Sequence, residues 1–411
     1  MKKCFDDVAM REGNPKWDKM ISRQHPIYAR NGDVRSDFAR DYTRILHSLA
    51  YRRLKHKTQV FYNAAGNDHI CTRIEHVQHV ESVSNTIANS LGLNEDLTKA
   101  IAMAHDLGHA PFGHQGEKII SNLTEKYLGK KFWHEQNGVY FVDCVELLED
   151  DNRCLQNLNL TYAVRDGIIS HCGELDQNAL RPREELFDLT EFDAPGKYNA
   201  STWEGCVVKL ADKIAYLGRD IEDAIRLGFL DSAKQEELLA IAQGKKATAI
   251  NTTVIMHNMI IDLCNNSNPD KGLCLSDEMS ELLNEIKRFN YENIYANPKM
   301  AVYTKYSRMI IEELFDALIS CYRGEDTIRY LDSTGFADKG FIRGFAEWLV
   351  QYCDIQCADL CRVKEIASRC NNIKIYGNLN DEKQYIQSVI DFIAGMTDTY
   401  AIKAFNELLE Y

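Results

Sequence analysis

A segment between residues 97 and 107 is apolar nearly all round when it is drawn as an α-helix, so it belongs at the centre of a larger helical bundle. Asn94, a residue type that often caps helices, precedes it. The segment nevertheless contains an adjacent ionisable pair, His105 and Asp106. Because buried charges need partners, this pair requires either hydrogen-bonding neighbours in the core or a bound cation.

Histidines are concentrated around this pair, and six of the chain's 12 lie between positions 69 and 114: His69, His76, His79, His105, His109 and His114. Imidazole and carboxylate together are ligands for the divalent metals of hydrolytic sites. Residues 74–91 carry a helical apolar stripe, with His76 on its edge and His79 about 60° farther round. We therefore predict that His76, His105 and Asp106 bind one metal ion, that His79 lies outside the site, and that a second carboxylate comes from elsewhere.

A break in the helical pattern follows, because Pro111 and Gly113 interrupt a helix after His109. Such a tight connection would let His109 and His114 turn back toward the metal. The pattern is helical again beyond His114, so His114 and Glu117 share one face. A carboxylate that close to an imidazole orients it or raises its basicity.

The composition, with 45% hydrophobic and 27% charged residues, is that of a globular protein with ample material for a core. Acidic residues outnumber basic ones 61 to 48, and the net charge of -13 argues against general nucleic-acid binding, although single-stranded nucleic acid stays possible. The chain has no apolar run near membrane-spanning length, no signal-peptide core at its start, and 13 cysteines without a short secreted framework. We therefore expect a cytoplasmic protein with no membrane contact.

The run HDLGHAPFGHQGE at 105–117 resembles the HD-domain phosphohydrolases, and more narrowly their deoxyguanosine triphosphate triphosphohydrolase (dGTPase) branch. Residues 35–61 resemble the opening of that family, and DFIAGMTDTYA at 391–401 resembles an element near its end, with Thr399 in place of an arginine. The resemblance implies an all-α fold, an HD-domain helical bundle elaborated with additional helices. It further implies a single body over residues 1–411, with the metal-binding core at about 70–225 and a helical elaboration at about 226–411.

The same resemblance supplies the missing carboxylate. Residues 204–224 read as a helix on which Asp212, Tyr216, Asp220 and Asp223 fall within about 80°. Asp212 completes the predicted metal ligands, and two histidines with two aspartates suit Mn²⁺ or Mg²⁺ better than structural zinc. By resemblance, Tyr216 packs under a deoxyribose and Asp220 accepts a hydrogen bond from its 3′-hydroxyl.

Further site residues are implied in the same way. FWHEQN at 132–137 resembles a family element, which assigns His134 a catalytic role beside His109, His114 and Glu117. Gln59 would approach the sugar, and the phosphates would meet three cations: Arg73, Lys213 and Arg308. A solvated helix face is an equally good interpretation of the segment around Arg308. His171 is interpreted as a structural histidine.

The implied function is metal-dependent hydrolysis of a deoxynucleoside triphosphate, with dGTP favoured, to deoxynucleoside and inorganic tripolyphosphate. One alternative is another HD phosphohydrolase that acts on nucleotide monophosphates or cyclic nucleotides. A second is a nucleotide-sensing or single-strand-binding protein without turnover, although a pure binder needs no water-activating ion. Family members are homo-oligomers, so we expect a homo-oligomer, and a nucleotide effector is compatible with the sequence.

Overall fold

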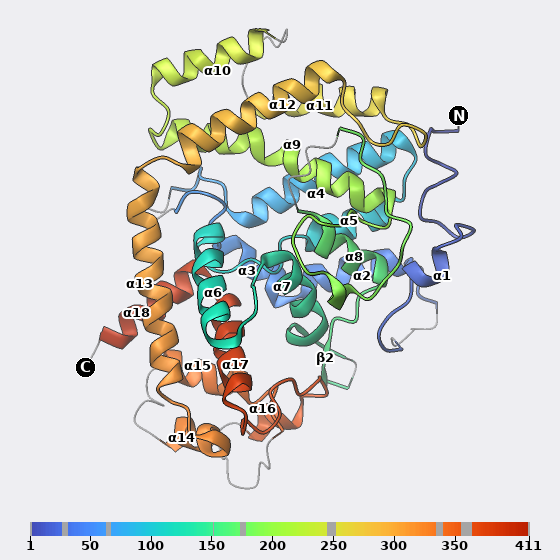
Figure 1. Cartoon of the computed structure of the whole chain (residues 1–411). Coiled ribbons are helices and arrows are strands. Elements are labelled where there is room, and N and C mark those ends of the chain that lie inside the picture. The colour runs from blue at the N-terminus through green and yellow to red at the C-terminus, as the bar shows by residue number, and fades with distance from the viewer. Residues whose placement is uncertain are drawn as a thin grey trace. The chain divides into compact units, whose positions relative to one another are not determined.

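The structure, a computed structural model, describes residues 2–26, 32–62, 67–150, 152–172, 178–244, 252–333, 340–354 and 364–409. Helices dominate these residues, and the only sheet among them has two strands (Figure 1). The predicted all-α class is confirmed. The chain divides into two compact units: unit 1 comprises Met1–Leu46, Gln59–Asp106 and Asn159–Tyr303, and unit 2 comprises His47–Thr58, Leu107–Leu158 and Thr304–Tyr411. The limits predicted for the core and the elaboration stay predictions.

The described part of unit 1 contains α-helices, one short 3-10 helix, η3, and one short π-helix, η4. In chain order the elements are α1 (Trp17–Met20), α2 (Asp37–His47), α4 (Arg73–Leu91), α5 (Glu95–Ala104), α8 (Tyr162–Ser170), η3 (Leu189–Glu191), α9 (Trp203–Arg226), α10 (Ser232–Gly244), α11 (Thr252–Asn266), α12 (Asp277–Asn290) and η4 (Tyr291–Tyr295). Helix α2 ends one residue beyond the boundary of the unit.

Helix α5 lies at the centre of unit 1, where it packs against α4, α8 and α9. Seven of its ten residues are buried, as the apolar pattern predicts. The side chain of Asn94 accepts a hydrogen bond from the N–H of Leu97 at 3.1 Å, which confirms the predicted N-cap.

Helix α5 ends at Ala104, so the prediction that the helix runs to residue 107 is wrong at its C-terminal end. The ring nitrogen Nδ1 of His105 lies 2.7 Å from the carbonyl oxygen of Ala102. A longer helix would pair that carbonyl with the N–H of Asp106. The imidazole therefore takes the place of the next backbone hydrogen bond, and the chain turns at the two residues predicted to bind metal.

Helix α4 carries His76 and is fixed at both ends. Thr72 and Glu75 form a capping box at its start. Gly92 ends it in the left-handed conformation, with φ of 90°, which glycine adopts without strain. The buried face of α4 packs on α5 and α9, so the three helices that bear the predicted metal ligands are in mutual contact.

Unit 2 contains α3 (Leu49–Arg53), η1 (Leu54–His56), α6 (Gly113–Leu128), α7 (His134–Tyr140), the π-helix η2 (Phe141–Val145), β1 (Leu147–Glu149), β2 (Leu155–Asn157), η5 (Gly324–Asp326), α14 (Thr327–Ser333), α15 (Gly340–Leu349), α16 (Lys364–Ser368), α17 (Glu382–Ala394) and α18 (Asp398–Leu409). Helix α13 (Lys299–Ile319) begins in unit 1 and continues into unit 2. The antiparallel strands pair Leu147 with Asn157, Leu148 with Gln156 and Glu149 with Leu155. Helix α6 packs against α17 and ends at Gly129, where φ is 66°.

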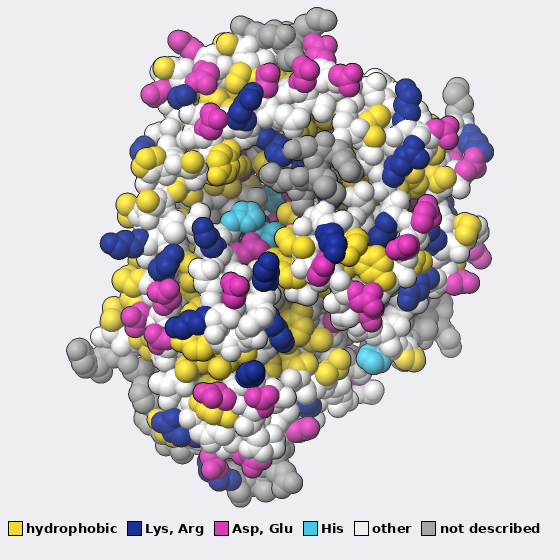
Figure 2. Space-filling model, viewed as in Figure 1, with side chains coloured by type: hydrophobic (Ala, Val, Ile, Leu, Met, Phe, Trp, Pro, Cys, Tyr) yellow, Lys and Arg dark blue, Asp and Glu magenta, His cyan; other side chains and the backbone are white. Residues whose placement is uncertain are grey.

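The surface mixes both signs of charge. Figure 2 shows Lys and Arg side chains scattered among Asp and Glu over the face in view. The cysteines that the structure describes are all free thiols. Within the described ranges, no helix combines the length and the apolar character needed to cross a membrane.

Candidate functional site

The four predicted metal ligands lie together in unit 1. His76 comes from α4, His105 and Asp106 follow the end of α5, and Asp212 comes from α9. The Nε2 atom of His76 lies 3.0 Å from Oδ1 of Asp212 and 3.9 Å from Oδ2 of Asp106. The Nε2 atom of His105 lies 3.4 Å from Oδ1 of Asp106 and 4.0 Å from Oδ1 of Asp212. Helix packing therefore brings together residues that are up to 136 positions apart in the sequence.

The chemistry of these donors fits a divalent cation. Because the Nδ1–H of His105 donates to the carbonyl of Ala102, the neutral ring carries its lone pair on Nε2. That Nε2 atom is buried and has no hydrogen-bond partner. Its nearest charged neighbours are carboxylate oxygens, which cannot donate a hydrogen bond. A cation would satisfy the lone pair and the carboxylates at once, and two imidazoles with two carboxylates suit Mn²⁺ or Mg²⁺.

Arg73, predicted to bind phosphate, lies buried at the start of α4. Its Nη1 donates to Oδ2 of Asp106 at 2.7 Å, and its Nη2 donates to the backbone oxygen of Gln59 at 3.1 Å. Arg73 therefore offsets part of the negative charge of Asp106. It also ties the segment that contains Gln59, predicted to approach the sugar, to the start of α4.

The sugar-binding face predicted on α9 is partly buried. Asp220 accepts a hydrogen bond from the hydroxyl of Tyr295 at 2.5 Å. Burial raises the pKa of Asp220 to about 7, although the hydrogen bond from Tyr295 acts in the opposite direction. Tyr216 and Lys213 are half-buried on the same helix. Sequence reasoning missed Tyr295, because a π-helix beyond a different helix places it and no local pattern announces that contact.

His79 and Asp223 have other partners. Nη2 of Arg219 lies 3.0 Å from Nε2 of His79, so the structure places His79 apart from the four donors. Oδ2 of Asp223 accepts a hydrogen bond from the N–H of Cys71 at 2.9 Å. This last contact fastens α9 to the residues just before α4, and it helps to hold His76 and Asp212 in register.

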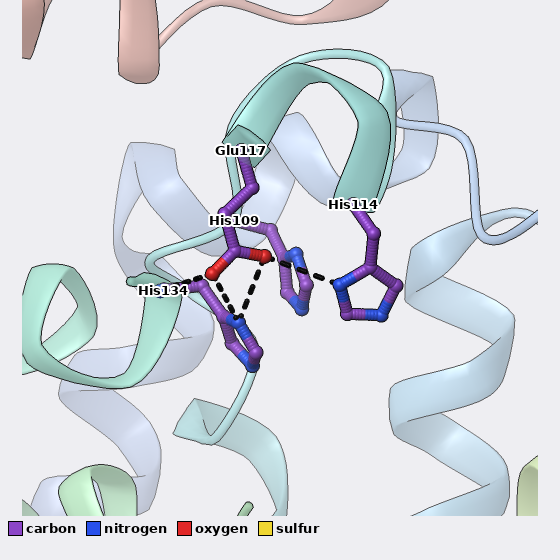
Figure 3. Close-up of side chains that lie close together, drawn as sticks. All are labelled: His109, His114, Glu117 and His134. Atoms are coloured by element: carbon purple, nitrogen blue, oxygen red, sulfur yellow. Dashed lines mark hydrogen bonds and ion pairs between the residues drawn. The ribbon is translucent and has the colours of Figure 1, made fainter. Parts of the chain in front are cut away.

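The four predicted catalytic residues form a separate cluster in unit 2 (Figure 3). Oε1 of Glu117 lies 2.8 Å from the backbone nitrogen of His134 and 3.0 Å from its Nδ1. Oε2 of Glu117 lies 3.1 Å from Nδ1 of His114. The rings of His109 and His134 are stacked, with centroids 3.8 Å apart and planes at 20°. His114 is the exposed member of the cluster, with 66% of its side chain accessible.

The charge of Glu117 organises this cluster. Burial acts to raise the pKa of Glu117, but His134, His114 and His109 outweigh it and hold the pKa well below its ordinary value. The carboxylate is therefore ionised at neutral pH and accepts hydrogen bonds from both Nδ1 atoms. Each of these rings then presents Nε2 on its other side, where it can give or take a proton.

A rigid turn places His109. A Cβ added to Gly108 would lie 2.1 Å from the carbonyl oxygen of His134, so only glycine allows the turn to approach α7 this closely. Asn137 donates from Nδ2 to the oxygen of Gly108 at 2.7 Å. Lys57 donates to the backbone oxygen of His109.

The end of this turn is anchored by the C-terminal part of the chain. Phe112 adopts the left-handed conformation, with φ of 65°, which is strained for a residue with a side chain. Its N–H donates to Oδ1 of Asp398 at 2.8 Å, and Oδ2 of Asp398 accepts from the N–H of Thr58 at 2.9 Å. Arg308, the remaining predicted residue, is exposed on α13 in unit 2.

Comparison with known proteins identifies the family of the chain. The model of the HD domain matches residues 73–217, and that of the phosphohydrolase-associated domain matches residues 273–326. A deoxyguanosinetriphosphate triphosphohydrolase-like protein of Caldanaerobacter subterraneus is 34% identical over 92% of this chain and 86% of its own length. A protein of the same name from Desulfatibacillum aliphaticivorans is 38% identical over 69% of this chain and 73% of its own length. One from Clostridium perfringens is 31% identical over 92% of this chain and 87% of its own length. The chain therefore belongs to the deoxyguanosinetriphosphate triphosphohydrolase-like proteins of the HD-domain family.

Proposed function

We propose that this protein hydrolyses deoxynucleoside triphosphates, with dGTP favoured, to deoxynucleoside and inorganic tripolyphosphate. The observation that carries the proposal is the quartet His76, His105, Asp106 and Asp212, in which the buried Nε2 atom of His105 has no hydrogen-bond partner and faces two carboxylates. The substrate class is taken from the name of the relatives. Membership of the HD-domain family and residues that could hold a divalent metal support a nucleotide phosphohydrolase.

A bound Mn²⁺ or Mg²⁺ ion would polarise a phosphoryl oxygen and lower the pKa of water. The chain's own residues would divide the remaining work. Arg73 already offsets the charge of Asp106. With Lys213 and Arg308, it would also neutralise the phosphates, and each such contact strengthens as negative charge develops on the phosphoryl oxygens in the transition state.

Proton transfer falls to the cluster around Glu117. Hydrolysis at the α-phosphorus forms a bond to the oxygen of water and breaks the bond to the nucleoside 5′-oxygen, which must receive a proton. Glu117 holds His114 and His134 with Nδ1 toward itself, so Nε2 of His114 can orient water, and His109 or His134 can protonate the 5′-oxygen. General acid–base catalysis of this kind contributes about 10² to 10⁴ in rate.

Selection of deoxyribose is assigned to α9. Asp220 would accept the 3′-hydroxyl, and Tyr216 would pack under the sugar, leaving no room for a 2′-hydroxyl. Tyr295 already holds Asp220 in one orientation. Gln59 would approach the same sugar.

A product assay tests the proposal. The full chain is incubated with each of the four dNTPs, with GTP, and with a nucleoside monophosphate and a cyclic nucleotide, in Mn²⁺ or in Mg²⁺. We expect deoxynucleoside and tripolyphosphate from dNTPs, most rapidly from dGTP, and a much lower kcat/KM for GTP. Equal kcat/KM for dGTP and GTP would contradict the assignment of Tyr216 and Asp220. Turnover of only the monophosphate or the cyclic nucleotide would replace the proposed function.

Assembly and location are proposed with the function. We propose a homo-oligomer, as the family resemblance implies, and a location in the cytoplasm, as the sequence suggests. Light scattering on the purified chain, with and without dGTP as an effector, measures the assembly state, and a monomer under all conditions would contradict the first of these proposals.

A further inference from the structure

His171, which the sequence suggested to be a structural residue, lies beside the metal ligands of unit 1. It follows the last residue of α8 and is buried, with 2% of its surface accessible. Its Nδ1 lies 2.7 Å from the carbonyl oxygen of Ile168, so the ring donates through Nδ1–H. In the neutral ring the lone pair is then on Nε2, and that atom lies 3.9 Å from Oδ1 of Asp106.

The ends of α5 and α8 repeat one local arrangement. At each end a histidine bonds through Nδ1, at 2.7 Å, to the carbonyl three residues earlier, Ala102 for His105 and Ile168 for His171. Each histidine thus replaces the next backbone hydrogen bond of its helix and fixes its own ring. Metal-binding histidines characteristically have their second nitrogen fixed by such a hydrogen bond.

Both rings aim at the same oxygen. Oδ1 of Asp106 lies 3.4 Å from Nε2 of His105 and 3.9 Å from Nε2 of His171. The two rings are 4.9 Å apart and nearly perpendicular, at 78°. Three donor atoms, one from each residue, lie within 4.8 Å of one another. With a neutral ring, His171 places a lone pair beside this carboxylate, an arrangement that a bound cation would stabilise.

We propose that His171 is a fifth protein ligand of the metal centre and binds the ion through Nε2, together with His105 and Asp106. This inference rests on the proposed function only in needing a metal ion at that centre. Donor atoms bound to one ion at about 2.0 to 2.2 Å lie about 3 to 4.4 Å apart, and both distances to Oδ1 of Asp106 fall in that range.

A third imidazole changes which ion the centre prefers. Imidazole suits transition metals, whereas Mg²⁺ prefers oxygen donors and retains its water. Three histidines with two aspartates therefore favour Mn²⁺, Fe²⁺ or Co²⁺ over Mg²⁺. We expect Mn²⁺ to bind the full chain at least tenfold more tightly than Mg²⁺.

The proposal is tested by counting the bound imidazoles. In the Co²⁺-loaded protein, each histidine ligand whose Nδ1–H is retained gives one strongly shifted exchangeable proton signal in the NMR spectrum. We expect signals from His76, His105 and His171, and the loss of one signal in His171→Gln. The matched control is His79→Gln, since His79 lies on the same helix as His76 and bonds to Arg219. His171→Gln should also bind Mn²⁺ about 10- to 100-fold more weakly than the wild type, and His79→Gln should bind it as the wild type does.

The possible outcomes separate this inference from the function on which it rests. Two shifted signals in the wild type, unchanged in His171→Gln, would overturn the assignment of His171 and leave the four-residue centre intact. No Co²⁺ or Mn²⁺ binding by the wild type would overturn the metal centre itself. If His171→Gln does not fold, the wild-type count decides, with His105→Gln expected to remove a different signal.

Discussion

Asp106 is the residue at which the interactions of the proposed metal centre meet. It accepts a hydrogen bond from Arg73, and its oxygens lie near nitrogens of His76 and His105. Asp106→Ala should abolish metal retention and hydrolysis. It also leaves the buried Arg73 without its carboxylate, and an unpaired buried charge costs about 3 to 5 kcal/mol of unfolding free energy.

Elemental analysis and denaturant unfolding of the purified variant measure both effects. His79→Ala is the control, because His79 is on the same helix and bonds to Arg219 instead. Full metal occupancy in Asp106→Ala would remove Asp106 from the centre.

Glu117 belongs to the proposed catalytic cluster and not to the proposed metal ligands. Glu117→Gln should keep the metal of unit 1 but lower kcat by about 10² to 10⁴, because a neutral amide cannot stabilise the orientation and charge of His114 and His134 as a carboxylate does. Glu125→Gln, at an exposed position of the same helix, is the matched control. The comparison is made by metal analysis and by single-turnover rates, and a kcat equal to that of the control would show that the cluster is structural.

The sequence predicts only some of the contacts between the site residues. His76, His105 and Asp106 could be predicted because metal chemistry limits the residue types and because helical spacing separates His76 from His79, whereas Asp212 was implied by the family resemblance. The contact of Tyr295 with Asp220 could not, since it joins positions 75 apart through a π-helix. The orientation of His171 toward Asp106 is likewise a tertiary contact, and a lone histidine in the sequence carries no sign of it.

Among the elements, the turn between α5 and α6 depends on the start of α18. Asp398 accepts the N–H groups of Phe112 and Thr58. Asp398→Asn keeps one acceptor but points an amide N–H at the other donor, and a buried unsatisfied N–H costs about 1 to 3 kcal/mol. We expect that loss of stability, together with a fall in kcat of about tenfold as His109 and His114 lose their fixed positions.

Asp381→Asn is the control for this variant, since Asp381 caps the neighbouring helix α17 at an exposed position. Thermal unfolding and steady-state kinetics give the two readouts. Unchanged stability and unchanged kcat would mean that Asp398 does not hold the turn.

Element boundaries were predicted well where backbone chemistry decides them and poorly where a side chain does. Pro111 interrupts the helical pattern as predicted, and α6 begins two residues later at Gly113. The end of α5 was placed three residues too late, because the helix is cut short by the imidazole of His105. The two-stranded sheet has only three residues in each strand, too few for an alternating pattern to stand out.

On the scale of the whole molecule, stability should depend on the ionisation of Asp391 in unit 2. Its carboxylate accepts hydrogen bonds from Tyr140, Tyr376 and Gln387. Burial nevertheless raises its pKa to about 6 from 3.8, and these hydrogen bonds only moderate the rise. A raised pKa in the folded state means that stability is fully present below pH 3.8 and is lost as the pH rises through about 6.

Asp391→Asn removes this titration. Between pH 5 and pH 8 the unfolding free energy of the wild type should fall by about 1 to 2 kcal/mol relative to the variant. Urea unfolding of both proteins at the two pH values measures the difference. A difference that does not change with pH would show that Asp391 is ionised throughout.

The all-α class of the described residues could be predicted because helical periodicity is a local property and because the chain resembles a family with that fold. The division into two units could not, since unit 1 is assembled from three separate stretches of sequence and unit 2 from three others. His105 and His109 illustrate the limit, because four positions along the chain separate a residue of unit 1 from one of unit 2.

The position of the bond that breaks tests the central claim most directly. dGTP is hydrolysed by the full chain in ¹⁸O-labelled water with Mn²⁺. The products are then separated, and the ¹⁸O content of each is measured by mass spectrometry. Attack of water at the α-phosphorus with release of the 5′-oxygen predicts unlabelled deoxyguanosine and tripolyphosphate that carries one ¹⁸O atom. Labelled phosphate with dGDP, or pyrophosphate with dGMP, would place the attack at another bond and contradict the triphosphohydrolase assignment.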